Sequence, residues 1–309
     1  MAGRSILAWL LAACGVCLSA DRPWKQGGSK QGPASVPARR TSLELAEYRL
    51  AAGPIRVEGI TDNLSGASYN PKTKTLFCAV DWPAMVVEIT TDGKLKRRFK
   101  VGEWNDVEGV VVHAADAFAI VEERTRMLVF FQIPPGDEKL VELDRAGARA
   151  VLVDPQPAGN QGLEGVAYDP AGKRFFIAKE KRPKQLYVVE MGPPAAVGRG
   201  GDPVPAKPAD KPKVRKLWTF EAKGIRLGDV SGLHFHPGTG HLLVLSEESR
   251  CVIECTLDGK EIGRLAVPHV PKAEGVTMDE KGTLYVVGEP NILLVFRRPR
   301  AQSTKKGPE

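Results

Sequence analysis

The ten residues from Asn160 to Asp169, NQGLEGVAYD, decide the fold, because four other stretches of the chain repeat their pattern. The copies are DNLSGASYN (62–70), NDVEGVVVH (105–113), GDVSGLHFH (228–236) and KAEGVTMD (272–279). Each copy places Ser or Glu before Gly and then enters a short apolar strand. A turn, an apolar run, an acidic residue and further apolar runs follow, which indicates a repeat of four strands.

Repeats built only of strands, with Gly, Pro, Asn and Asp at the turns, are typical of a β-propeller with one four-stranded blade per repeat. Five copies predict an all-β, five-bladed propeller, and a six-bladed ring is the alternative. The Ser or Glu positions lie 43, 56, 67 and 43 residues apart. The two longer intervals must therefore contain insertions, and the Pro- and Gly-rich residues 192–213 are expected to be a disordered insertion in blade three.

The two ends of the predicted domain, residues 43–297, complement each other. LELAEYRL (43–50) has the alternation of a strand and precedes the first repeat, whereas the fifth repeat has only three strands. We expect the amino-terminal strand to complete blade five, so that no sheet edge is left beside a gap in the ring.

The composition fits one large domain, and the charge distribution argues against a nucleic-acid partner. The chain has 309 residues, 42% of them hydrophobic, and a net charge of +7. Residues 21–40, 192–216 and 297–309 each carry a net charge of +4, which leaves the folded body negative. A basic binding face is thus not expected, and the body should favour cations.

The amino terminus predicts export to the periplasm or cell envelope. Residues 1–20 have an early basic residue, a short apolar run and small residues at the end. Cys14 fits a lipobox and would then be lipidated, cleavage near Ala20 is the second reading, and an uncleaved anchor is the third. Residues 21–42 are expected to be a disordered tether, and residues 298–309 a basic tail. The protein is expected to be a monomer.

The recurrent Ser or Glu residues should face one mouth of the central channel, because the innermost strands of a propeller begin beside it. Gly follows each of them, as expected where five strands crowd an axis and a side chain would clash. These five positions are Ser65, Glu108, Glu164, Ser231 and Glu274.

Three carboxylates in one narrow channel repel each other, and a hard cation would relieve the repulsion. Calcium takes six to eight oxygen ligands. The predicted ligand set is Glu108, Glu164, Glu274, Ser65, Ser231, Asp106, Asp229 and Asn63. The alternative is that these carboxylates accept hydrogen bonds from backbone N–H groups of the neighbouring blade.

A second ring of acids ends the second strand of each blade and is a candidate binding rim. It consists of Asp81, Glu123, Glu180, Glu248 and Glu289. Because Arg124, Lys181 and Arg250 lie close by in sequence, ion pairs between blades would explain most of this ring.

Other motifs for chemistry are absent from the sequence. It contains no G-x-S-x-G, P-loop, Rossmann or H-E-x-x-H pattern. His234 and His236 lie two apart on one strand and are expected at the surface. Cys78, Cys251 and Cys255 are expected to be buried thiols, since the last two lie too far apart along a strand for a disulfide.

The order of the motifs resembles the SdiA-regulated family of YjiK-like proteins from about Leu45 to Arg297. The resemblance rests on NLSG, TLFCAVDWPAMVVEITTDG, DVEGV, EER, LEGVAYD, AKEKRP, DVSGL, LLVLSEESR, AEGV and YVVGEPN. It implies a five-bladed propeller, a calcium site and a membrane-associated amino-terminal segment on an exported bacterial protein. The family has no established activity. The Pro-rich insertion and the lipobox depart from its pattern.

Three functions are compatible with these features. The first, which we favour, is a non-catalytic, calcium-stabilised binding module that recruits a protein or glycan through its loops. The second is a metal-dependent hydrolase that acts on lactones or phosphoesters with the channel cation. The third is a scaffold whose ion only locks the blades. The sequence shows no unpaired His or Lys at the motif positions that could serve as an obvious base, which argues against the second function.

Overall fold

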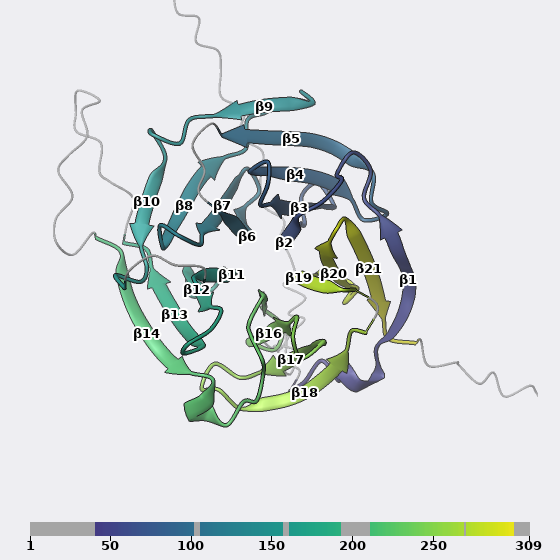
Figure 1. The fold of residues 1–309 in the computed structure, drawn as a ribbon, viewed down its shortest axis with the longest axis vertical. Coiled ribbons are helices and arrows are strands. Elements are labelled where there is room, and N and C mark those ends of the chain that lie inside the picture. Colours follow the sequence, from purple (N-terminus) through teal and green to yellow (C-terminus); the bar gives the residue numbers. More distant parts are fainter. Residues whose placement is uncertain (1–40, 102–105, 157–160, 193–210, 269, 300–309) are drawn as a thin grey trace, which may run out of the picture. The chain divides into compact units, whose positions relative to one another are not determined.

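The computed structural model describes residues 41–101, 106–156, 161–192, 211–268 and 270–299. Within them, five antiparallel blades form a ring with almost no helix (Figure 1). The five-bladed propeller predicted from the repeated motif is confirmed, and the six-bladed alternative is wrong.

Each blade places its motif strand innermost, against the motif strands of both neighbours. Blade one contains β2 (Leu64–Asn70), β3 (Thr75–Val80), β4 (Met85–Thr90) and β5 (Leu95–Val101). Blade two contains β6 (Val107–Ala114), β7 (Ala117–Glu122), β8 (Met127–Gln132) and β10 (Arg149–Leu152). Blade three contains β11 (Leu163–Asp169), β12 (Arg174–Lys179), β13 (Gln185–Glu190) and β14 (Lys213–Thr219).

The remaining two blades complete the ring. Blade four contains β15 (Gly232–His236), β16 (His241–Ser246), β17 (Cys251–Cys255) and β18 (Glu261–Ala266). Blade five contains β19 (Lys272–Met278), β20 (Leu284–Glu289), β21 (Ile292–Arg297) and β1 (Arg49–Arg56). Two 3-10 turns, η1 (Leu45–Glu47) and η3 (Glu221–Lys223), precede β1 and follow β14.

The hydrophobic core lies between the faces of adjacent blades. Second strands such as β3 and β7 are buried at every residue, because a neighbouring blade covers each of their faces. Between blades one and two, the rings of Phe77, Phe99 and Phe118 have centroids 5.7–6.0 Å apart. The apolar runs of the repeat are thus explained by burial on both sides.

The amino-terminal segment closes the ring, but the closing strand starts later than predicted. β1 pairs antiparallel with β21 from Arg49 onward, and residues 45–47 form η1 instead of a strand. The φ angle of 57° at Glu44 interrupts the extended chain. Leu43 and Leu45 are buried with side chains of blades four and five, so their alternation reflects this seam and not a sheet.

A buried carboxylate holds this segment against blade four. Glu254 accepts hydrogen bonds from the Leu43 backbone N–H (2.9 and 3.1 Å) and the Ser42 hydroxyl (3.0 Å), and His241 Nδ1 lies 2.7 Å away. Arg298 pairs with Glu44 and Glu47 at 2.6 and 3.0 Å. Ser42 and Arg298 therefore belong to the fold, although they were predicted to lie in the tether and the tail.

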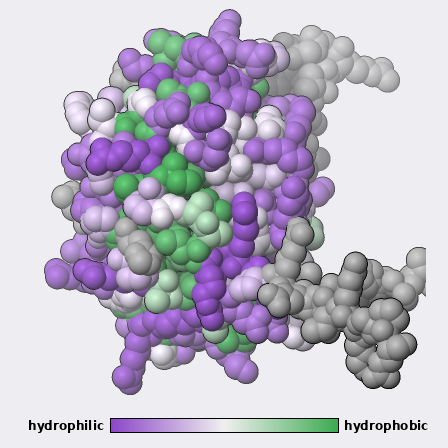
Figure 2. Space-filling model, turned by 90° about the vertical axis from the view of Figure 1, so that its right-hand side faces the viewer, coloured by the Kyte–Doolittle hydropathy of each residue, from purple (hydrophilic) through white to green (hydrophobic). Residues whose placement is uncertain are grey.

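β1 is the outer edge of blade five. Figure 2 views the ring from this side, where a hydrophobic area crosses the middle of a mainly hydrophilic surface. Leu50 on β1 is 37% exposed. Pro54, which lacks an N–H, and register shifts on both sides of Ala52 interrupt the ladder along this edge, as is common in edge strands.

The two long intervals contain the expected insertions. In the first, β9 (Leu140–Leu143) pairs parallel with β5 and adds a fifth strand to the sheet of blade one. The second lies between β13 and β14, and its residues 193–210 are outside the described part of the chain. The predicted export signal with Cys14, nearly all of the tether and most of the basic tail are outside it as well.

The cysteines and the helices of the described residues add two facts. Cys78, Cys251 and Cys255 are buried free thiols, as expected. No helix in these parts of the chain is long and apolar enough to cross a membrane.

Candidate functional site

The five Ser/Glu-Gly pairs lie at the start of the inner strands, where four blades shift register. The pairing of the first two strands slips at this point in blades one, two, three and five. Such irregularities re-aim side chains next to functional sites. The register shift thus occurs where the Ser or Glu side chain points into the channel mouth.

The glycines are required by the crowding of the axis. A Cβ on Gly66 would lie 2.6 Å from the Glu108 carbonyl oxygen, and one on Gly109 would lie 2.2 Å from that of Glu164. On Gly275 it would lie 2.6 Å from the Ala67 nitrogen. The predicted reason for the invariant glycine within the repeat, a clash between neighbouring inner strands, is confirmed.

A cavity of about 330 Å³, which we call the acidic mouth, opens at this end of the channel. Its lining contains eight carboxylates, two lysines and two serines. These are Asp81, Glu108, Glu164, Glu180, Asp229, Glu247, Glu274, Glu289, Lys181, Lys272, Ser65 and Ser231. All five motif residues therefore face one mouth.

Six of the eight predicted metal ligands line the acidic mouth, and the other two do not. Asp106 lies just outside the lining and groups with Asp81 and Glu108. Asn63 is turned away, because its side-chain amide donates to the Trp82 carbonyl at 2.9 Å. Asp229 is already engaged, since one oxygen accepts from the Ser246 hydroxyl (2.5 Å) and the Glu248 backbone N–H (3.1 Å).

The predicted binding rim is only partly assembled. Asp81, Glu180 and Glu289 line the cavity. Glu123 lies beside it and accepts from the Gly162 N–H at 2.9 Å. Glu248 is exposed, and Glu247 takes its place in the lining. The pair Glu247-Glu248 in the fourth repeat indicated an acid at this position. Which of the two faces the acidic mouth depends on the turn after β16.

Ion pairs account for part of the rim, as expected from the neighbouring basic residues. Lys181 contacts Glu180 at 2.6 Å and Glu248 at 2.9 Å, and Arg124 pairs with Asp106. The prediction for Arg250 is wrong, because it forms no ion pair with the described residues. Lys272, which the sequence reasoning missed, pairs with Glu289 at 3.0 Å.

Two groups of carboxylates approach closely enough to share an ion. In one, oxygens of Asp81, Asp106 and Glu108 lie within 4.8 Å of one another. In the other, oxygens of Glu123, Glu164 and Glu180 do so. Glu108 and Glu164, from neighbouring inner strands, link the two groups.

Burial and mutual repulsion hold protons on Glu108, Glu164 and Glu274. Burial, with the charges of Asp81 and Glu274, raises the pKa of Glu108 to about 8. Burial and the charge of Glu289 raise that of Glu274 to about 7. The pKa of Glu164 rises well above its usual range through burial and the charge of Glu108. The two lysines thus do not compensate the carboxylates.

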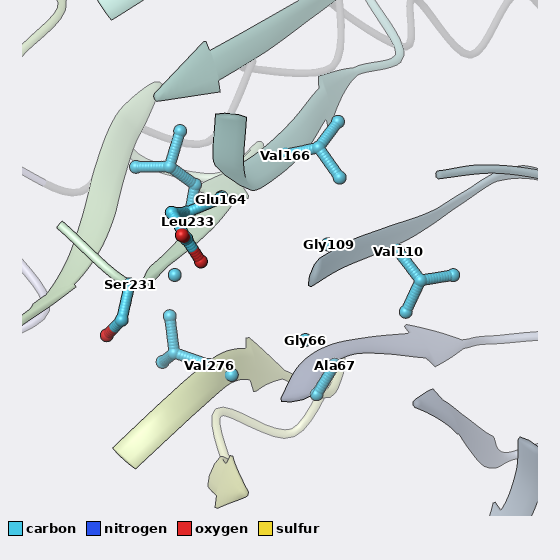
Figure 3. A pocket seen from close by; sticks show the side chains of 12 residues that line it. Gly66, Ala67, Gly109, Val110, Glu164, Val166, Ser231, Leu233 and Val276 are labelled. Atoms are coloured by element: carbon cyan, nitrogen blue, oxygen red, sulfur yellow. The ribbon is translucent and has the colours of Figure 1, made fainter. Parts of the chain in front are cut away.

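An apolar waist closes the channel beneath the acidic mouth. The residue after each glycine is apolar, and Figure 3 shows Ala67, Val110, Val166, Leu233 and Val276 around the axis beside Glu164. The space between them is about 10 Å³, roughly enough for one water molecule. The acidic mouth is therefore a blind cavity.

The donor set of the acidic mouth fits a hard cation. Its oxygen ligands are carboxylates and hydroxyls, and the described lining contains no His or Cys. Calcium prefers such oxygen sets, whereas zinc and copper prefer nitrogen and sulfur. One predicted ligand, Ser231, donates its hydroxyl proton to the Ala273 carbonyl at 2.8 Å and retains lone pairs for a cation.

The histidine pair lies elsewhere. His234 and His236 were expected at the surface, but both are half-buried and line a cavity at the opposite end of the inner strands.

This chain is similar to several solved structures at low sequence identity. A gluconolactonase from Xanthomonas campestris is 14% identical, with 82% of this chain and 95% of that chain covered and a TM-score of 0.45. The calcium-binding protein regucalcin from Agrobacterium tumefaciens is 13% identical, with 79% and 92% covered and a TM-score of 0.46. A chain of a nidogen/laminin complex is 11% identical, with 74% and 73% covered and a TM-score of 0.47.

The family comparison is more specific, because it follows the sequence along the whole propeller. The sequence model of the SdiA-regulated family matches residues 40–297, from the segment before η1 to the end of β21. These are the residues whose motifs build the blades, the glycine ring and the acidic mouth. The protein belongs to the SdiA-regulated family.

Proposed function

We propose that this protein is a calcium-binding propeller of the cell envelope that acts as a non-catalytic binding module. The observation that carries the proposal is the imbalance of charge in the acidic mouth, where eight carboxylates face two lysines. Buried carboxylates that repel one another are stabilised by a hard divalent cation.

The ion would be held by side chains from different blades. Glu108, Glu164 and Glu274 come from the inner strands of blades two, three and five, and Ser65 from that of blade one. An ion shared by these groups would join the inner strands around the axis. It would stabilise the ring and fix the loops of this face, which is the surface we propose for a protein or glycan partner.

The proposed location follows from the amino-terminal sequence. Residues 1–20 have the pattern of an export signal, and Cys14 is the candidate for lipidation. The tether 21–42 would then separate a monomeric propeller from the membrane.

Calcium binding can be tested by thermal unfolding of the purified chain with chelator and with added calcium. A ligand that binds only the native state at a hundredfold excess over its Kd adds about 2.7 kcal/mol, or roughly 5–10 °C in Tm for a domain of this size. Glu164→Gln should abolish most of this shift. Glu142→Gln, at an exposed position on β9, is the matched control and should retain it.

The proposal is wrong if calcium leaves the Tm of the wild-type chain unchanged. If Glu164→Gln keeps the full shift, the ion binds elsewhere. Isothermal titration of both variants with calcium measures binding directly. It would therefore show whether a smaller shift in Tm reflects a lost calcium site or only a changed enthalpy of unfolding.

A metal-dependent hydrolase is the second candidate, favoured by the size of the acidic mouth. A cavity of about 330 Å³ exceeds the space that a bare ion needs and falls in the range of small-molecule sites. Its lining offers Glu and Lys side chains for proton transfer. Turnover of lactone or phosphoester substrates that requires calcium and is lost in Glu164→Gln would support this function over the binding module.

A further inference from the structure

The opposite end of the channel contains a second cavity, which we call the aromatic mouth. Its volume is about 520 Å³. The inner strands reach it two residues beyond the waist, where the motif places Tyr69, Val112, Tyr168, Phe235 and Met278. The same strands therefore begin in the acidic mouth and end in this one.

The walls of the aromatic mouth are formed by rings. Tyr69, His113, Tyr168 and Phe235 belong to the lining. The rings of His113 and Tyr168 meet edge-on with centroids 5.8 Å apart, and both pack against the buried Phe175 behind them, at 5.4 and 4.7 Å. Pro71, Pro170 and Pro237 also belong to the lining. Flat apolar walls of this kind accept a planar ring in stacked or edge-on contact.

The polar groups of the aromatic mouth are neutral or already paired. Burial lowers the pKa of His234 to about 3 and also lowers that of His113, so both rings are uncharged near pH 7. Asp279 accepts hydrogen bonds from the Thr283 N–H and the Tyr285 hydroxyl, and Glu280 pairs with Lys74. No Lys or Arg belongs to the described lining.

This electrostatic environment selects against anions. The formal negative charges in the described lining belong to Asp279 and Glu280, and an anionic ligand would find no Lys or Arg partner there. His234 belongs to the lining as a neutral ring, and its unprotonated ring nitrogen can accept a hydrogen bond from a ligand hydroxyl or N–H.

The volume of the aromatic mouth and the apolar waist beneath it are also consistent with a ligand site. A volume of about 520 Å³ lies within the range of sites for drug-sized molecules. The waist of about 10 Å³ separates this cavity from the acidic mouth, so that a ligand cannot pass from one to the other.

We propose that the aromatic mouth binds a neutral, planar aromatic molecule that carries a hydrogen-bond donor. The rings of Tyr69, Tyr168 and Phe235 contact its faces, and His234 accepts its hydrogen bond. This site is independent of the cation site, and its occupant does not depend on calcium.

The test uses the full chain and two fluorescent probes that share their rings. N-phenyl-1-naphthylamine is neutral and has one N–H donor, whereas 8-anilinonaphthalene-1-sulfonate adds a sulfonate to the same ring system. We expect one saturable site per chain for the neutral probe, and binding of the anionic probe that is weaker by about tenfold or more.

Variants locate the probe in the cavity. Ala114→Trp and Ala115→Trp each add an indole to an exposed position of the lining and should weaken binding by about tenfold or more. Ala222→Trp adds the same group at an exposed position outside the lining and should leave the affinity unchanged. Glu164→Gln and chelator should also leave it unchanged.

Three results would overturn the proposal. These are no saturable binding of the neutral probe, equal affinity in Ala115→Trp and Ala222→Trp, and equal affinity for both probes. Circular dichroism identifies a variant that does not fold. If either Ala114→Trp or Ala115→Trp is unfolded, the other variant is used for the test.

Discussion

The two mouths of the channel are built from the same five strands, yet they have opposite chemistry. At the start of the strands, Glu108 and Glu164 retain protons because burial raises their pKa values and neighbouring carboxylates raise them further. At the end, the half-buried rings of His113 and His234 lose their protons because desolvation lowers their pKa values. The glycines and the apolar waist separate the two environments by only a few residues of strand. One repeated motif can therefore line two different sites, because successive positions along a strand lie in successive layers of the channel.

The largest expected effect is on both mouths together. Deleting residues 41–56 removes β1 and the contacts of Leu43 with Glu254, and leaves blade five without its outer strand. We expect loss of the cooperative unfolding transition and of binding at both ends of the channel. Deleting residues 21–40 should change neither the Tm nor binding. If the first deletion melts like the second, the ring does not depend on this closure.

The next largest effect is expected at the layer between the mouths. In Gly109→Ala, the new methyl group would lie 2.2 Å from the Glu164 carbonyl oxygen and 2.8 Å from the Val121 side chain, and backbone must move. We expect a loss of about 3 kcal/mol in the free energy of unfolding, measured by urea titration. In the control Gly263→Ala, the nearest atoms are 3.9 Å away. Equal stability of the two variants would show that the inner strands are not tightly packed.

The smallest effect is a pair of opposite pH dependences in the chelator-treated protein. The folded pKa values of Glu108 and Glu274, about 8 and about 7, exceed the usual 4.5, so the folded state binds their protons more tightly. Their contribution to stability is greatest below pH 4.5 and falls as the pH rises to 8. For His234 the folded pKa of about 3 lies below 6.5, so its contribution is complete above pH 6.5 and falls toward pH 3.

Melting curves between pH 4 and 8.5 separate the two contributions. The Tm of the wild type should decrease by a few degrees above pH 6.5, and this decrease should be smaller in Glu108→Gln. His234→Asn should instead reduce the decrease on the acid side. A wild-type Tm that rises between pH 6.5 and 8 would contradict the expected protonation of the acidic mouth.

Much of the propeller could be predicted, because its determinants are local and repeated. The Ser/Glu-Gly pairs marked the inner strands, and the need for glycine follows from crowding that every blade experiences. The boundaries of the closing segment could not be predicted, because Leu43 and Leu45 alternate like a strand but pack into a seam between blades. Likewise, β9 joins the sheet of blade one although it lies in the sequence of blade two.

The candidate site was predictable at the motif positions and not around them. Glu108, Glu164 and Glu274 were found from the repeat and line one cavity. Whether Glu247 or Glu248 faces that cavity depends on a turn. Lys272 reaches the cavity from the first position of the fifth copy, where three other copies have Asn63, Asp106 or Asp229.

By itself, the sequence determined the number of blades, the innermost strands and the ring of acids and glycines, since each of these repeats within short segments whose chemistry is visible residue by residue. Only the tertiary structure decided which carboxylates share a cavity, how the amino-terminal segment closes the ring and that a second cavity lies beyond the waist. These features arise from interactions between residues that are far apart in the chain or differ from blade to blade. Examples are the hydrogen bond between Leu43 and Glu254 and the charge repulsion between Glu108 and Glu164.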